Sequence, residues 1–269
     1  MKNLIGIILL ILALFLIFNM TEIAVTDTNT GEPVSFAKIG YFYTDESGKA
    51  IFLGTILKNN LNVSRIGYKD KTINLPLAFL KRTREINLDV NDYQGLISQF
   101  SQWSENLSRY KYTFSTNLIQ NSKTEKVQFI ARKIGRNFSF EMRNEGESGK
   151  TTKIVNIGDN MYTSVDSGPL KGPLSEEDKQ KFMSENIVFL SLSDIILDSF
   201  PVEVPQEIKF EGNTISILWN SSNILNAFLD KNGNISEMDF FEFGSDRSFK
   251  SILKIDTINI EKIEVNESR

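Results

Sequence analysis

The sequence predicts a mainly β protein of the α+β class, with an N-terminal transmembrane helix, a small antiparallel β-sandwich and a larger antiparallel β domain that carries helices. Three observations support this prediction. An unbroken apolar run opens the chain. Short alternating apolar segments separated by turn residues follow it. The remainder combines helical apolar stripes with longer alternating segments. We therefore assign residues 1–20 to the membrane segment, 21–90 to the sandwich and 91–269 to the larger domain.

The apolar run begins at Leu4 and ends at Phe18, and we expect it to contact the membrane. As a helix it covers about 22 Å, less than the roughly 30 Å of a hydrocarbon core. This length also suits the apolar core of a secretory signal. Small residues of the A-x-A type are missing before Glu22, which favours an uncleaved signal-anchor, with a removed signal peptide as the alternative. A buried core helix is disfavoured because the run has no polar face.

Charges around this run predict its orientation. Lys2 precedes the run, whereas Glu22 and Asp27 follow it. Because positive residues remain on the cytoplasmic side, we expect a single-pass protein of the cell membrane, with the bulk of the chain extracytoplasmic. The chain has no cysteine, so neither a lipid-modified cysteine nor a disulfide is available there.

The overall composition is that of an ordinary globular chain with a weak negative charge. Of the 269 residues, 41% are hydrophobic and 24% are charged, and the formal net charge is −4. No run of lysine and arginine stands out. Nucleic-acid binding is therefore disfavoured, because it depends on neutralising phosphates. The sequence carries no signal for the oligomeric state.

The part after the membrane segment consists of short strands separated by polar turns. Ile23 and Val25 alternate with polar neighbours, and an acidic turn follows at residues 44–49. Several short strands with turns at this spacing predict an antiparallel sandwich. Asp45 and Glu46 could bind Ca²⁺, but a solvated hairpin turn is the simpler interpretation.

Four segments of this part carry a resemblance to a known family. They are VTDTNTGEPVSFAKI (25–39), TDESGKAIF (44–52), LNVSRIGYKDKTINL (61–75) and a closing INL (86–88). Together they resemble the carboxypeptidase regulatory-like domain, a transthyretin-like β-sandwich of seven strands. The resemblance implies support, spacing or adhesion without catalysis. Gly67 and Tyr68 form either a recognition site or, as we favour, a turn with an aromatic plug over the sandwich edge.

The larger domain begins with a helix. Asn91 and Asp92 can cap it, and we expect it to run to about Arg109. Apolar residues fall at helical spacing along one side of it, namely Leu96, Ile97, Phe100, Trp103 and Leu107. Since such a stripe normally packs against a sheet, we interpret Trp103 as a core residue and not as part of a ligand site.

Alternating segments after this helix predict a series of hairpins. The first strand starts at Tyr110, and further strands follow up to residue 163. Acidic residues at 175–178 predict the start of a helix, and a second apolar helix is expected at 187–200. Strands return at residues 214–219, 224–229, 235–243 and 249–265.

This order of one helix, hairpins, a helical insertion and more hairpins resembles the lipoprotein-carrier and lipoprotein-sorting superfamily (LolA/LppX-like). The segments that carry the resemblance are Tyr112-Thr113-Phe114, GRNFSFEMR (135–143), VNIGDNMYT (155–163) and AFLDKNGNISEMDF (227–240). The resemblance implies a half-open antiparallel β-barrel with lid helices, whose concave apolar face holds acyl chains. A lipid or a lipidated protein is then the expected partner.

Aromatic residues on one face of a strongly curved sheet form either a filled core or a ligand-holding hollow. Both interpretations remain open from the sequence. The candidate cavity liners are Tyr112, Phe114, Phe129, Phe140, Trp219 and Phe241.

Several motifs look chemical but have simpler explanations. Residues 146–151 (GESGKT) resemble the end of a phosphate-binding loop but lack its first glycine and its following helix. Residues 230–234 (DKNGN) begin like a calcium loop, but the glycine comes two positions too early, which favours an Asn-Gly turn. Histidine is absent, which excludes Ser-His and Cys-His nucleophile pairs. We expect no catalytic residue, no metal site and no cofactor, and hence no enzyme.

Two functions follow from the sequence. The first is a membrane-anchored extracytoplasmic protein whose large domain binds a lipid or another apolar ligand, in lipid or lipoprotein handling. The second is a non-enzymatic scaffold or adhesion protein of the cell envelope that uses both β domains as interaction surfaces. A hollow interior of the large domain favours the first function, and tightly packed phenylalanines favour the second.

Overall fold

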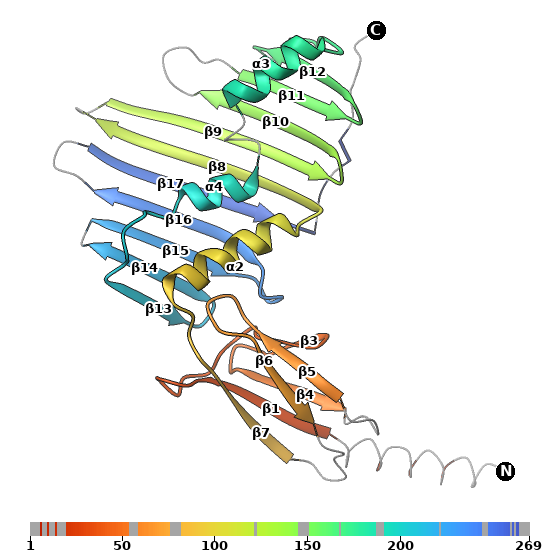
Figure 1. Cartoon of the computed structure of the whole chain (residues 1–269), viewed down its shortest axis with the longest axis vertical. Coiled ribbons are helices and arrows are strands. Elements are labelled where there is room, and N and C mark those ends of the chain that lie inside the picture. The colour runs from red at the N-terminus through yellow and green to blue at the C-terminus, as the bar shows by residue number, and fades with distance from the viewer. Residues whose placement is uncertain are drawn as a thin grey trace. The chain divides into compact units, whose positions relative to one another are not determined.

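A computed structural model of the chain describes residues 6, 10, 14, 20–53, 59–75, 82–120, 123–144, 151–166, 168–186, 191–220, 222–243, 247–258, 260 and 262–263. The chain divides into two compact units (Figure 1). The small unit comprises Met1–Leu96, Phe210–Thr214 and Leu229–Asn234, and the large unit comprises Ile97–Lys209, Ile215–Phe228 and Ile235–Arg269.

The predicted transmembrane helix falls mostly outside the described residues. Within it, Gly6, Leu10 and Leu14 are helical and exposed. Across the described ranges, none of the helices combines the length and the apolar character that a membrane crossing requires. The signal-anchor therefore stays a prediction from the sequence.

Two sheets form the small unit (Figure 1). The three-stranded sheet has the order β4-β1-β7, with β1 at Met20–Asp27, β4 at Lys49–Leu53 and β7 at Arg82–Leu88. The four-stranded sheet has the order β3-β2-β5-β6, with β2 at Lys38–Ile39, β3 at Phe42–Tyr43, β5 at Asn59–Ser64 and β6 at Lys71–Leu75. Both sheets contribute to one core that includes Ile23, Val25, Ile39, Val63, Ile73, Ile86 and Leu88. This arrangement agrees with the predicted sandwich.

One strand pairing differs from the prediction of an antiparallel sandwich. β1 is antiparallel to β4 but parallel to β7. The chain passes through the four-stranded sheet between β4 and β7, and β7 then re-enters the first sheet in the same direction as β1. Alternation of apolar residues identifies a strand and its buried face, but it does not encode the direction of the neighbouring strand.

The acidic turn between β3 and β4 is closed by its own aspartate. The Asp45 Oδ1 atom accepts hydrogen bonds from Ser47 Oγ at 2.7 Å, from Ser47 N at 2.9 Å and from Lys49 N at 2.9 Å. These bonds, that of the Ser47 hydroxyl first, hold the pKa of Asp45 below its ordinary value. Gly48 adopts a φ of 71°, which suits glycine in a tight turn. The geometry agrees with the hairpin-turn interpretation.

Tyr68 is a buried plug inside the small unit. Its ring centroid lies 5.0 Å from that of Phe210, and the Arg65 guanidinium carbon lies 5.3 Å from the Tyr68 ring centroid. Gly67 has a φ of 97°, and a Cβ atom there would lie 2.1 Å from the Phe210 ring. Only glycine fits this position. The interpretation of Gly67 and Tyr68 as a turn with an aromatic plug agrees with this packing.

The large unit is built on a ten-stranded sheet with the order β12-β11-β10-β9-β8-β17-β16-β15-β14-β13 (Figure 1). The strands are β8 (Arg109–Gln120), β9 (Lys123–Ile134), β10 (Asn137–Asn144), β11 (Thr151–Ile157), β12 (Asn160–Val165), β13 (Glu207–Glu211), β14 (Thr214–Asn220), β15 (Asn223–Leu229), β16 (Ile235–Phe243) and β17 (Arg247–Asp256). Every pairing whose register is described here is antiparallel. β12 and β13 are edge strands, so the described strands form an open sheet and do not close into a barrel.

The centre of this sheet joins the two ends of the domain sequence. β8 is its first strand and β17 its last, and the two pair over ten positions from Arg247 opposite Gln120 to Asp256 opposite Lys111. The last strand therefore completes the sheet between β8 and β16, so the middle of the sheet is held by contacts between residues far apart in the sequence.

Within the described residues of this unit, the sheet is accompanied by α2 at Tyr93–Glu105, α3 at Glu176–Asn186 and α4 at Leu192–Asp198. Asp92 caps α2, since its Oδ1 atom accepts from Gly95 N at 2.7 Å. The buried residues of α2 are Tyr93, Leu96, Phe100 and Ser104. Of the predicted stripe only Leu96 and Phe100 are buried, whereas Ile97, Trp103 and Leu107 are half-buried. Its expected end at about Arg109 is wrong, because the helix stops at Glu105 and Arg109 already starts β8.

The second apolar helix is shorter than expected. It was predicted over residues 187–200, but α4 covers Leu192–Asp198, and residues 187–190 lie outside the described part. Ser191 caps it by accepting from Asp194 N, and Pro201 follows its end. The apolar sequence continues past both ends of the helix, which is why a pattern alone overestimates its length.

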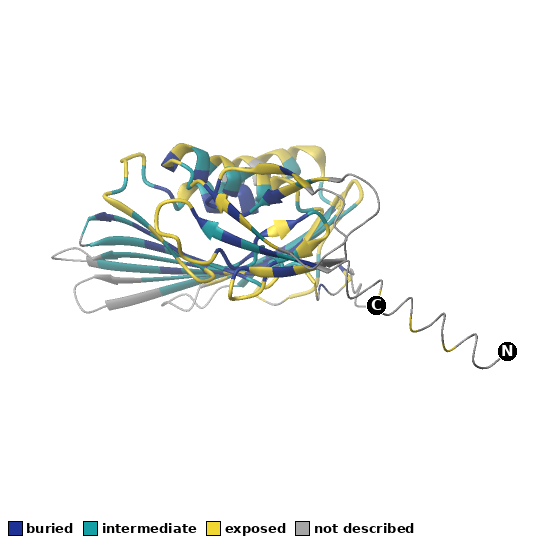
Figure 2. Ribbon diagram, turned by 90° about the horizontal axis from the view of Figure 1, so that it is seen from below, coloured by how far each residue is buried: buried dark blue, intermediate teal, exposed yellow. Residues whose placement is uncertain are grey.

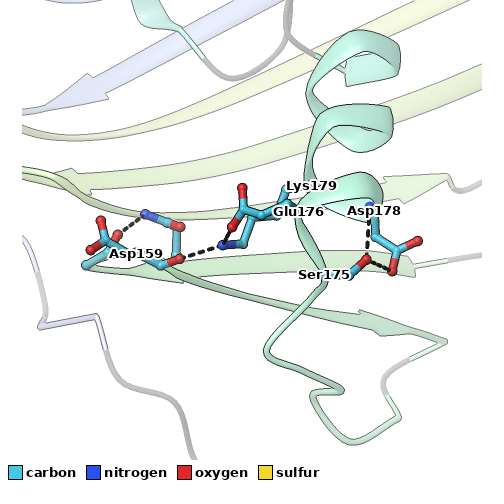
Figure 3. Close-up of polar contacts among 7 residues, drawn as sticks. Asp159, Ser175, Glu176, Asp178 and Lys179 are labelled. Carbon is cyan, nitrogen blue, oxygen red and sulfur yellow. Dashed lines mark hydrogen bonds and ion pairs between the residues drawn. The ribbon is translucent and has the colours of Figure 1, made fainter.

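The start of α3 was predicted from its acidic residues, and the structure confirms it (Figure 3). Ser175 Oγ donates to Asp178 Oδ2 at 2.7 Å, while Asp178 N donates to Ser175 Oγ at 3.2 Å. Lys179 Nζ donates to the Asp159 carbonyl at 2.8 Å and pairs with Glu176 at 2.6 Å. The Ser175 hydroxyl thus caps the Asp178 N–H, and this favours a helix start at this point.

Candidate functional site

The strand register sorts the side chains of the large sheet onto two sides. Directly opposite residues on neighbouring antiparallel strands point to the same side of a sheet. Tyr110, Tyr112 and Phe114 therefore define one side, which we call the helix side, and Lys111 and Thr113 define the other, which we call the outer side.

Contacts to α4 place this helix over the helix side. A hydrogen bond joins the Tyr110 hydroxyl to the backbone of Leu192, the first residue of α4. The Phe100 ring of α2 meets the Phe200 ring, just after α4, at a centroid distance of 5.2 Å in an edge-on arrangement. Figure 2 shows the helices along one side of the sheet. α4 and the C-terminal part of α2 therefore pack together on the helix side of the sheet.

An apolar row crosses the helix side from strand to strand. Leu253 lies opposite Phe114, Phe114 opposite Phe129, and Phe129 opposite Met142. Met238 extends the row on β16, since it lies opposite Leu253. Five neighbouring strands thus contribute one apolar side chain each at the same level.

Three phenylalanines on this side stack on one another. The ring centroids of Phe114 and Phe129 are 6.0 Å apart with an interplanar angle of 25°, and those of Phe129 and Phe140 are 5.7 Å apart at 26°. Tyr110 and Tyr112 stack in the same way along β8, at 6.1 Å and 25°. Offset stacking at these distances is favourable and orders the rings. The structure therefore brings together four of the six predicted liners: Tyr112, Phe114, Phe129 and Phe140.

Burial along the helix side is uneven. Tyr112, Phe129 and Phe140 are buried, whereas Phe114 and Met142 are only half-buried. Phe240 and Phe249 are half-buried on the same side, and their rings meet at 6.3 Å. Val127, opposite Thr116 on β9, is half-buried too. We call the five half-buried residues, one on each of β16, β17, β8, β9 and β10, the apolar strip: Phe240, Phe249, Phe114, Val127 and Met142.

The buried tyrosines of this side remain neutral. Burial raises the pKa of Tyr112 well above its ordinary value, and the neighbouring Tyr110 adds to this effect. Burial also raises the pKa of Tyr110, partly offset by the hydrogen bond with Leu192. Two uncharged phenols beside stacked phenylalanines keep this part of the sheet apolar.

Trp219 lies on another part of the sheet. It shares one side of β14 with Ile215 and Ile217, and all three are buried. Its Nε1 atom donates to the Glu203 carbonyl at 2.9 Å, in the segment between α4 and β13. The indole thus holds this segment against the sheet, and no described register places it next to the stacked phenylalanines.

Phe241 points to the outer side and does not share a side with the other four. It lies opposite Lys250 on β17, and the Lys250 Nζ atom is 4.8 Å from its ring centroid. Its neighbour Phe240 is the one that faces the helix side. Because Phe240 and Phe241 are adjacent, the alternating pattern allows either of them to face the helix side. The sequence alone therefore could not assign the two rings to their sides of the sheet.

The outer side is rich in charge. Charged residues on it include Lys111, Arg132, Glu141, Lys153, Glu237, Asp239, Lys250 and Lys254. Burial, followed by the charge of Glu237, raises the pKa of Asp239, while Lys250 and Lys254 oppose the shift. This side is therefore charged but not uniformly solvated, since the Asp239 Oδ1, Arg132 Nε and Asn117 Oδ1 atoms are buried.

Sequence reasoning missed Phe240, Phe249 and Met142 as members of the helix side. The signal was present in β17, where Phe249, Leu253 and Ile255 recur at even spacing, but fixing the side required the pairing with β8.

The DKNGN segment forms a turn in which Asp230 Oδ1 accepts from Asn232 N at 2.8 Å and Asn234 N at 2.9 Å. This geometry agrees with the turn interpretation.

Metal and phosphate sites have little support in the described residues. Within the described ranges, no three acidic side chains gather where a metal ion could bind. The segment that resembles a phosphate-binding loop falls mostly on residues 145–150, outside the described part. The expectations of no metal, no cofactor and no catalysis stay predictions.

Comparisons with known proteins gave only distant matches. No protein-family profile matches the chain, and no curated protein matches it. The chain is similar to a LolA superfamily protein from Nitrosomonas europaea, with 7% identity and a TM-score of 0.26, over 65% of this chain and 96% of the other. It is also similar to a DUF1329 family protein from Desulfovibrio piger, with 8% identity and a TM-score of 0.22, over 60% of this chain and 88% of the other. A chain of the MucA/MucB complex of Pseudomonas aeruginosa matches with 11% identity and a TM-score of 0.25, over 61% of this chain and 59% of the other. These TM-scores are too low to establish a shared fold, and no function is carried over from them.

Proposed function

We propose that this is a membrane-anchored, extracytoplasmic protein whose large unit binds a lipid or another long apolar molecule on the helix side of its sheet. The apolar run that ends at Phe18 supplies the anchor, and the small unit, a carboxypeptidase regulatory-like domain by resemblance, supports and spaces the large one. The large unit then belongs to the LolA/LppX-like lipoprotein carriers, as its element order implies.

The observation that carries this proposal is the apolar strip. It runs over five adjacent strands, which at about 4.8 Å per strand corresponds to about 19 Å. Its members are half-buried, although their neighbours Phe129 and Phe140 are buried. A long, narrow apolar surface suits an acyl chain, because burying that surface releases water without requiring hydrogen bonds.

The uneven burial supports a binding surface, because the apolar side chains of a completely packed core would all be buried. Partly exposed apolar side chains that recur on several neighbouring strands often mark an interaction site. Ser251 and Thr116 are the polar residues that lie between Phe249 and Phe114 on this side. On the outer side of the same sheet, half-buried apolar residues such as Phe241, Ile252 and Ile130 are interspersed with charged residues. An acyl chain that lies along the strip would cover Phe240 and Phe249 at one end, Phe114 in the middle and Met142 at the other end.

A photoactivatable fatty acid tests this function in the full-length chain. Cells that express the chain are given a diazirine fatty acid, irradiated, and the crosslinked peptides are mapped by mass spectrometry. We expect crosslinks on the strip residues of β8, β9 and β10. Val127→Lys should reduce the crosslinks about tenfold or more, because a lysine charge against an acyl chain costs well over 1.4 kcal/mol.

Gln128→Lys is the matched control. Gln128 is the next residue on β9, is also half-buried, and points to the outer side, where its amide lies 3.4 Å from Ser115 Oγ. We expect this variant to keep its crosslinks. Absence of crosslinks from the wild-type chain, or equal loss in both variants, contradicts the proposal.

A scaffold or adhesion role is the second candidate. The complete burial of Phe129 and Phe140 favours it, because rings that pack against one another form a core without any ligand. This role predicts protein crosslinks on intact cells that are unchanged by Val127→Lys. The fatty-acid experiment therefore separates the two candidates.

A further inference from the structure

Exposed apolar side chains of the sandwich gather at one end of it. Among the described residues of β1 to β7, three large apolar side chains are exposed: Tyr41 at 96%, Phe42 at 52% and Ile51 at 63%. Single exposed apolar residues are ordinary on a protein surface, but three at the same end of a small domain, on both of its sheets, suggest that this end meets an apolar environment.

Tyr41 sits in the tight turn between β2 and β3. Ile39 pairs with Phe42, so Gly40 and Tyr41 are the two central residues of the hairpin turn. Gly40 adopts a φ of 59°, which a type II′ turn requires at its first central position. The turn needs only this glycine, and it leaves the next residue free to be polar. A fully exposed tyrosine there has no structural cause within the sandwich.

The strand register gives the end at which this turn lies. β2 runs antiparallel to β5, with Lys38 opposite Ser64 and Ile39 opposite Val63. The turn therefore points toward Asn59, where β5 begins. Tyr41 falls at the level of Leu61, two residues and hence about 7 Å from that start.

The same end holds the start of β1. Met20, its first residue, lies opposite Leu53, the last residue of β4, and β5 begins at Asn59, shortly after β4 ends. Figure 1 shows the end of β4 and the starts of β1 and β5 on the same side of the sandwich. Ile51 is two residues from Leu53, also about 7 Å from this end.

The sequence leaves no linker between the predicted anchor and β1. The apolar run ends at Phe18, and only Asn19 separates it from Met20. If the run lies in a bilayer, this end of the sandwich must lie within the headgroup layer. Tyrosine is enriched at that depth, because its ring is apolar and its hydroxyl stays hydrated.

We infer that Tyr41, with Phe42 and Ile51, forms a membrane-surface contact that fixes the sandwich against the lipid headgroups. This inference rests on the membrane anchor of the proposed function. It is independent of the ligand on the large sheet.

The opposite end of the sandwich has a different chemistry. The turns there are polar and closed by aspartates: Asp27 Oδ1 accepts from Asn29 N at 2.7 Å, and Asp45 Oδ1 accepts from Ser47 N at 2.9 Å. Glu46 is exposed in the second of these turns. Acidic turns would be repelled by anionic headgroups, whereas the Tyr41 turn carries no acid.

The absence of cysteine from the chain allows a direct test in the full-length protein. Tyr41→Cys and, as the control, Glu46→Cys are each labelled with an NBD maleimide. The chains are reconstituted into phosphatidylcholine and phosphatidylglycerol vesicles. We expect the label at position 41 to shift to the blue and to lose most of its fluorescence when the phosphatidylcholine carries bromine. The label at position 46 should show neither change.

Other outcomes overturn the inference. A label at position 41 that reports water in a chain that resists carbonate extraction shows that the anchor exists but the turn does not touch lipid. A blue shift that appears in detergent and grows with protein concentration shows that the patch binds a second copy instead. A chain that carbonate extracts removes both the anchor and this contact, while crosslinks on the apolar strip would still leave ligand binding standing.

Discussion

The two sides of the ten-stranded sheet alternate along the same strands, yet they carry opposite chemistry. On β9, Phe129 is buried on the helix side, and its neighbour Ile130 is half-buried on the outer side. The helix side stacks rings across three strands, whereas the outer side places Lys250 over Phe241 and surrounds Asp239 with charge.

This difference identifies the part of the sheet in which apolar side chains are not fully covered by protein. The outer side mixes exposed charges such as Lys254 with buried polar atoms such as Asp239 Oδ1, so it is only partly hydrated. An apolar side needs cover along its whole length, and here burial is complete beside Tyr112 and Phe140 but only partial along the apolar strip. A ligand is the simplest cover for the rest.

The largest expected difference between the two sides is in stability. Phe129→Ala should lower the free energy of unfolding by about 3–5 kcal/mol, because it leaves a cavity among stacked rings. Ile130→Ala, the next residue on the outer side, should cost roughly 1 kcal/mol. Urea unfolding of both variants, followed by circular dichroism, measures the difference. Equal losses would show that the two sides are packed alike.

The buried tyrosines predict a loss of stability in alkali. Burial holds the pKa of Tyr110 and Tyr112 above the ordinary value of about 10, so the unfolded chain loses these protons first. The free energy of unfolding should therefore fall as the pH rises through 10, by up to about 1.4 kcal/mol per pH unit and residue. Urea unfolding at several alkaline pH values measures this slope. A slope that Tyr112→Phe leaves unchanged would contradict the assignment.

The hydrogen bond between Tyr110 and α4 gives a smaller effect. Tyr110→Phe should cost about 1 kcal/mol, since the Leu192 backbone loses its partner. Tyr162→Phe, on the outer side of β12, should change stability by less than about 0.5 kcal/mol. Thermal unfolding of the two variants compares them, and a larger loss in Tyr162→Phe would argue against a helix layer on the Tyr110 side.

The smallest effect belongs to the outer side. The contact of Lys250 with the Phe241 ring is partly solvated, so Phe241→Leu should cost about 0.5–1 kcal/mol. Lys250→Met should show a similar loss, and the double variant should lose less than the sum. A double-mutant cycle measures this coupling. Zero coupling would mean that the contact adds nothing to the outer side.

Local chemistry made several elements predictable from the sequence. The Asp92 cap of α2 and the acidic start of α3 each act within one or two turns of helix, and each was found where expected. Of the predicted α2 stripe, Leu96 and Phe100 are buried. The range of β16 agrees with its prediction because its alternation ends in clear turns. Four of the six proposed liners were found on one side for the same reason.

Long-range pairing accounts for what could not be predicted. The parallel contact of β1 with β7 and the antiparallel contact of β17 with β8 join residues far apart in the chain. Phe240 and Phe241 satisfy either strand phase, so only the pairing with β17 assigned them to opposite sides. β13 was missed because its short alternation follows the two prolines at 201 and 205.

Alkylation of single cysteines on β9 tests most directly whether a lipid covers the helix side. Val127→Cys and Gln128→Cys are each treated with a bulky maleimide, first in membranes from expressing cells and then after exhaustive delipidation in detergent. The account predicts that position 127 reacts slowly in membranes and much faster once lipid is removed, while position 128 reacts at the same rate in both states. Equal rates at position 127 before and after delipidation would contradict it.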